Sequence, residues 1–155
     1  MMPTLFVSHG APTLLTDDCP ARDFLRTVGE SMPRPSAIVC VSAHWESAEP
    51  RVTGVPFPDT IHDFYGFPPR LYDMRYPAPG NLRLAERVAG HLADAGLTVH
   101  VDGRRGLDHG AWVPLALMYP AADIPVIQLS VQSRADPEHH LAVGAALAAV
   151  RADDA

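Results

Sequence analysis

The sequence predicts an α/β fold: a single domain with a central, mostly parallel sheet flanked by helices on both faces. Short apolar segments typical of buried strands alternate along the chain with segments of helical spacing. The length of 155 residues suits one domain with a hydrophobic core. Apolar residues make up 47% and charged residues 19% of the chain, a balance typical of globular rather than disordered proteins.

The first part of the chain is expected to contain two strands and a helix. Residues 5–7 are apolar and β-prone, and the turn residues 8–12 end this strand. Residues 21–31 have helical apolar spacing, and prolines follow them. Residues 36–42 form a nearly continuous apolar run, which is typical of a strand buried on both faces of a parallel sheet.

The middle of the chain is expected to be irregular. The segment from Glu49 to Gly80 is rich in proline and contains six aromatic residues, so it suits neither a helix nor a strand, apart from a short strand at residues 51–55. Long irregular segments in compact domains are usually functional, and we interpret this one as a wall of the active site. The alternative is a surface linker.

Helices and strands alternate in the last part of the chain. Asp136 is expected to cap the last helix, with Pro137 at its first position. The expected helices cover residues 82–95, 111–119 and 137–150, and the expected strands cover residues 97–101 and 124–129.

Charge and hydropathy argue against two classes of partner. The net charge is −6 and the basic residues are scattered, so no basic stripe is available for nucleic acid. The longest uncharged apolar run, residues 141–150, has about half the ~20 residues of a bilayer span. The N-terminus lacks the features of a secretory signal, so we expect a cytoplasmic protein. Cys19 and Cys40 do not form a disulfide framework, and Cys40 is expected to be a small buried apolar residue.

Two histidines occupy positions that suit ligand binding. His9 and His44 each follow a predicted strand, and ligands in open α/β folds collect at the carboxyl ends of strands. Two imidazoles at neighbouring strand ends could share one metal ion. Their spacing of 35 residues is not a local metal motif, and the alternative is that both histidines hydrogen-bond the backbone near the edge of the sheet.

A third histidine has the surroundings of an acid or base. His109 lies between Asp108 and Gly110; the carboxylate could orient the ring, and the glycine permits close approach of a substrate. The alternative is a helix-capping aspartate followed by a histidine in a turn. We expect His62, Trp45 and Asp108 to contact a substrate, although a tryptophan is more often part of a core.

Four segments in sequence order carry a family resemblance. They resemble signature blocks of the DOPA 4,5-dioxygenase group, which belongs to the class III, LigB-type extradiol ring-cleavage dioxygenases. The segments are Ser8-His9-Gly10-Ala11-Pro12, Ser42-Ala43-His44-Trp45-Glu46, Ile61-His62-Asp63-Phe64-Tyr65-Gly66-Phe67-Pro68 and Asp108-His109-Gly110-Ala111-Trp112-Val113-Pro114-Leu115.

The resemblance implies an enzyme that opens the ring of a small, DOPA-like catechol with O2. His9 and His44 would then bind a non-haem Fe(II), with Zn(II) able to take the same site, and His109 would act as the acid and base. Two imidazoles with open coordination positions suit an iron that binds an aromatic diol and O2.

The resemblance also has a departure. Chains of this group continue past the last helix into another strand and a Ser-Gly…His-Asn block with a further ligand, so we expect residues 1–155 to form a catalytic domain that lacks its C-terminal part. His109, Glu46 or a neighbouring subunit of a homo-oligomer would then complete the metal shell. A non-catalytic metal-binding or interaction protein and a zinc-dependent hydrolase are the alternative functions.

Overall fold

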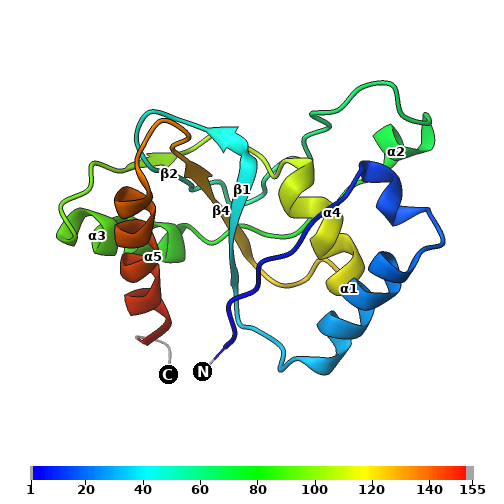
Figure 1. Ribbon diagram of the computed structural model, residues 1–155, viewed down its shortest axis with the longest axis horizontal. Helices are drawn as coiled ribbons and strands as arrows, with labels where there is room; N and C mark the ends of the chain where they lie inside the picture. The colour runs from blue at the N-terminus through cyan, green and yellow to red at the C-terminus, as the bar shows by residue number, and fades with distance from the viewer. Residues whose placement is uncertain (1, 153–155) are drawn as a thin grey trace.

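A computed structural model describes residues 2–152 and contains one four-stranded sheet (Figure 1). The spatial order of the strands is β1 (Ile38–Glu46), β4 (Val126–Val131), β2 (Arg51–Thr53) and β3 (His100–Asp102). The outer pairs β1–β4 and β2–β3 are parallel, and β2 meets β4 in antiparallel orientation. The predicted α/β class with a mostly parallel sheet is confirmed.

Helices cover both faces of this sheet, as predicted. On one face the short 3₁₀ helix η1 (Pro12–Leu15) and α1 (Pro20–Ser31) pack with α4 (His109–Met118). On the other face α3 (Leu82–Asp94) packs against α5 (Pro137–Ala152). Figure 1 shows these groups on opposite sides of β1 and β4, with the four-residue α2 (Arg70–Asp73) beyond α4. Each face therefore has its own hydrophobic core.

Helix α4 is the central helix of the larger core. Its residues are apolar on every side of the helix, which is typical of a buried helix. The Asp108 carboxylate accepts a hydrogen bond from the Ala111 amide and caps the helix. We predicted that this helix begins at Ala111. Because of the cap, α4 begins two residues earlier, at His109, and His109 is held in its first turn.

Two predictions about the first strands are wrong. Residues 5–7 form no strand; Leu5 is 45% exposed and Phe6 fully exposed, so this short apolar segment has no neighbour to pair with. The strand predicted at residues 36–42 exists as β1, but it is longer and is not buried on both faces. It lies at the edge of the sheet, where Val41 is 50% exposed.

The later elements agree with prediction to within three residues at each end. Strand β3 begins at His100, because the Leu97 amide still donates to the Leu92 carbonyl to close α3. Strand β4 begins at Val126, directly after a proline that has no amide hydrogen to donate. Asp136 caps α5 as predicted: its carboxylate accepts from the His139 amide at 2.8 Å.

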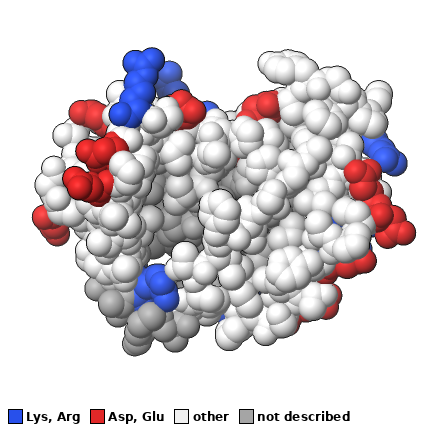
Figure 2. All heavy atoms as spheres, in the orientation of Figure 1, with Lys and Arg blue, Asp and Glu red and all other residues white. Residues whose placement is uncertain are grey.

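Figure 2 shows charged side chains around the margin of one face, with uncharged surface between them. No helix within residues 2–152 is long and apolar enough to cross a membrane. Burial, and then the charge of Asp108, raises the pKa of the Cys40 thiol to about 12, so this thiol is protonated at neutral pH.

Candidate metal centre

Three histidines from distant parts of the chain meet beside β1. His9 comes from the irregular N-terminal segment, His44 lies within β1, and His109 is the first residue of α4. Each offers a ring nitrogen, and these nitrogens all lie within 4.8 Å of one another. The Nε2 atoms of His9 and His44 are 2.9 Å apart. The structure thus brings together His9 and His44, which we predicted as metal ligands, and His109, which we predicted as an acid and base.

The surroundings of His9 suit a metal ligand. Burial lowers its pKa, and the neighbouring His109 and His44 rings lower it further, so the ring is neutral at pH 7. Its Nδ1 atom is buried without a hydrogen-bond partner among the described residues. Neutral imidazole is the form that binds zinc or iron, and a buried ring nitrogen without a protein partner is rare in a folded protein. The residues therefore fit a transition-metal ion.

The ring of His109 is oriented by Asp63. The Asp63 Oδ1 atom accepts from the backbone amide of His109 at 3.0 Å and from the ring Nδ1 at 2.8 Å. Burial raises the pKa of Asp63, but these hydrogen bonds outweigh it and hold that pKa below its ordinary value. An ionised Asp63 fixes the proton of His109 on Nδ1 and leaves the Nε2 lone pair for other partners.

Asp108 does not orient His109, although it is adjacent in sequence. Its side chain has no exposed surface and accepts hydrogen bonds from Ser42 Oγ at 2.6 Å, from Arg105 Nη2 at 3.1 Å and from the Gln128 side-chain amide. A buried carboxylate that is satisfied in this way has no surface to offer a substrate. We therefore assign Asp108 a structural role that joins α4 to the sheet, in place of the expected substrate contact.

A close contact between α4 and β1 positions His44. The Ser42 hydroxyl that donates to Asp108 also accepts from the His44 amide at 3.2 Å. Gly110 lies against this pair: a Cβ atom there would overlap the Ser42 hydroxyl and lie 2.8 Å from the His44 ring. Glycine at position 110 is therefore required by packing against the strand.

Trp45 lies under an arginine. It is only 6% exposed, and the Arg105 guanidinium lies 4.8 Å from the centre of its ring. The same guanidinium donates to the His44 carbonyl at 3.4 Å and to Asp108. Trp45 thus packs against Arg105, which also contacts the part of β1 that carries His44. A substrate contact by the Trp45 ring stays a prediction.

The irregular segment contributes an aromatic cluster next to the centre. The Phe64 ring lies edge-on to His109 at 5.7 Å, and Tyr72 and Trp112 pack around Phe64. His62 lies behind Phe64: its ring packs on Trp112 at 5.6 Å and its Nε2 faces the Met74 carbonyl at 2.9 Å. Phe64 is therefore nearer to the three histidines than His62, the residue we predicted to contact a substrate.

Sequence reasoning alone did not single out Asp63 and Phe64. Both lie in the block Ile61-His62-Asp63-Phe64-Tyr65-Gly66-Phe67-Pro68, whose resemblance to the family was the available signal. The pairing of Asp63 with His109 spans 46 residues and depends on the tertiary fold.

The chain resembles known proteins over nearly its whole length. Residues 3–155 match the family described as the catalytic LigB subunit of aromatic ring-opening dioxygenase. The chain is 52% identical to "4,5-DOPA dioxygenase extradiol" of Beta vulgaris, over 96% of this chain and 57% of that relative. It is 46% identical to the protein of the same name from Escherichia coli K12, over 97% of this chain and 55% of that relative.

A solved structure has the same fold. The crystal structure of an uncharacterized protein from Escherichia coli K12 superposes with a TM-score of 0.71 and 38% identity, over 88% of this chain and 50% of that chain. The chain thus spans little more than half the length of the relatives that it matches.

Proposed function

Because the chain belongs to the family of the catalytic LigB subunit of aromatic ring-opening dioxygenases, we propose that it opens the ring of a small catechol with O2. The observation that carries this proposal is the convergence of His9, His44 and His109 on one point. Two relatives are named as 4,5-DOPA dioxygenases, so a DOPA-like catechol is the proposed substrate.

In this proposal His9 and His44 hold the metal ion. Fe(II), when bound there, supplies the one-electron chemistry with O2 that no side chain can supply. Zn(II) fits the same imidazole donors but has no redox chemistry, so it would fill the site without turnover. The comparisons favour neither a non-catalytic protein nor a zinc-dependent hydrolase.

His109 is proposed as the acid and base. With its proton held on Nδ1 by Asp63, its Nε2 atom can take a proton from a catechol hydroxyl and later return it. The Asp63 carboxylate then stabilises the imidazolium that forms. The Phe64 ring beside His109 restricts the access of water to this proton.

The proposed activity has a direct test. Protein loaded anaerobically with Fe(II) is expected to consume O2 and DOPA in equal amounts and to form a yellow ring-fission product. Absorbance and an oxygen electrode follow the two reactants together, and the zinc-loaded protein serves as the inactive control. A fully iron-loaded protein that consumes no O2 with DOPA or simpler catechols would contradict the proposal.

The role of His109 predicts a separation of metal binding from turnover. His109→Ala is expected to retain iron and to lower kcat by about 10²-fold to 10⁴-fold, the usual contribution of a general acid or base. Asp63→Asn is expected to lower kcat by about 10-fold to 100-fold because the ring loses its charged partner. The matched control is Asp59→Asn on the same segment, where the carboxylate is exposed. Normal turnover by His109→Ala would refute this role.

A further inference from the structure

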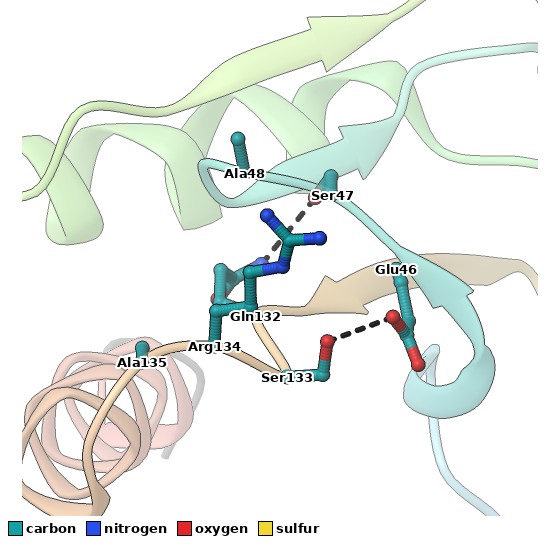
Figure 3. Close-up of a pocket in the computed structure, with 7 residues that line it drawn as sticks. All are labelled: Glu46, Ser47, Ala48, Gln132, Ser133, Arg134 and Ala135. Carbon is teal, nitrogen blue, oxygen red and sulfur yellow. Dashed lines mark hydrogen bonds between the residues drawn. The ribbon is translucent and has the colours of Figure 1, made fainter.

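A second recess lies at the carboxyl ends of β1 and β4. It is a cavity of about 440 Å³ between the chain that follows β1 and the chain that joins β4 to α5, lined by residues 46–48 and 132–135 (Figure 3). This volume is in the range of small-molecule sites. Its position is where open α/β sheets bind their ligands.

Two opposite charges share this cavity without pairing. The Glu46 carboxylate accepts from the Ser133 hydroxyl at 2.7 Å through one oxygen, Oε2. The Arg134 guanidinium makes no hydrogen bond or ion pair with any residue in the described range 2–152, and Figure 3 shows it projecting into the space between Ser47 and Glu46. A carboxylate and a guanidinium that each lack an ion-pair partner within residues 2–152 are complementary to a ligand that carries both charges.

Strand β1 connects the cavity with the histidine centre. Glu46 follows His44 by two residues on β1, so their Cα atoms are at most about 7 Å apart. In DOPA, the catechol hydroxyls and the α-amino acid group lie at opposite ends of the aromatic ring, so the molecule is long enough to extend from one position to the other.

We propose that this cavity binds the α-amino acid group of the substrate, with Glu46 pairing with the ammonium group and Arg134 with the carboxylate. A guanidinium can hold a carboxylate through two parallel hydrogen bonds, which adds orientation to charge attraction. The inference rests on the proposed function, because it takes the catechol ring as the group held at the three histidines. It makes the cavity the determinant that selects an amino acid over a simple catechol.

Four ligands and two variants test the two charges separately. The ligands are DOPA, dopamine, which lacks the carboxylate, 3-(3,4-dihydroxyphenyl)propionate, which lacks the ammonium group, and 4-methylcatechol, which lacks both. Dissociation constants are measured by calorimetry on the full zinc-loaded chain without O2, so that no turnover interferes. Arg134→Gln is expected to weaken DOPA and the propionate about fivefold to tenfold, and Glu46→Gln to weaken DOPA and dopamine by a similar factor.

The controls fix how each outcome is interpreted. Arg104→Gln and Glu30→Gln change exposed charges outside the cavity and are expected to leave all four constants unchanged. Equal binding of all four ligands by every variant, with 4-methylcatechol still bound, would overturn this inference and leave the proposed function intact. Failure of the wild-type chain to bind any catechol would overturn the proposed function, and this inference with it.

Discussion

The His44→Ala variant is expected to lose its zinc under conditions in which the wild-type chain retains one equivalent. Removal of this imidazole leaves His9 as the remaining ligand of the proposed pair, whose Nε2 atoms lie 2.9 Å apart. Since loss of a mere outer partner of a metal ligand weakens binding by about 10-fold to 100-fold, loss of a ligand should weaken it by more than about 100-fold.

Competition with a chelator of known zinc affinity measures this effect. His44 is exposed, so the variant is expected to keep its fold, which circular dichroism can verify. The matched control is His100→Ala. The His100 ring lies outside the centre and contacts the Glu49 carboxylate at 2.7 Å. Zinc affinity equal to wild type in His44→Ala would show that His9 and His44 do not hold the metal ion.

The Asp108→Ala variant is expected to lose about 3–5 kcal/mol of unfolding free energy, the range seen when one partner of a buried charged network is removed. The side chain is fully buried, and its loss leaves the Arg105 guanidinium, the Ser42 hydroxyl and the Gln128 amide without their shared acceptor. The cap of α4 is lost as well. This is the largest effect on stability that we expect from a single side chain near the centre.

Urea unfolding followed by circular dichroism measures this loss as a lower midpoint concentration. Asp108→Asn should lose less, because an amide keeps the shape and part of the hydrogen bonding. Asp94→Ala, at the exposed end of α3, is the control and should change the midpoint little. A loss below about 1 kcal/mol in Asp108→Ala would mean that the network contributes little to the fold.

Much of the architecture could be predicted because local patterns determine it. Residues 82–94 have one apolar face, and α3 covers that range. The start of α5 is also determined by residues close in sequence, namely the capping Asp136 and the proline that follows it. The prediction of a strand at residues 5–7 was wrong because a short apolar run becomes a strand only if another strand is available to pair with it.

The candidate site was predictable in its residue types but not in its contacts. His9, His44 and His109 could be identified because each lies in a segment that resembles a signature block of the family, and these segments occur in the family's order. The partner of His109 was expected to be the adjacent Asp108, but an N-cap side chain turns back toward its own helix backbone, which takes it away from the next residue's ring. Asp63 takes that place through the path of the irregular segment, which no local rule specifies.

The positions of Trp45 and Trp112 have a consequence for observing this centre. They are the two tryptophans of the chain, and each is close in sequence to a site histidine: Trp45 follows His44 on β1, and Trp112 lies one turn after His109 on α4. Indole emission depends on nearby charges and packing, and these two rings lie against Arg105 and the aromatic cluster. The intrinsic fluorescence of the protein therefore reports on both elements that carry the centre, without an added label.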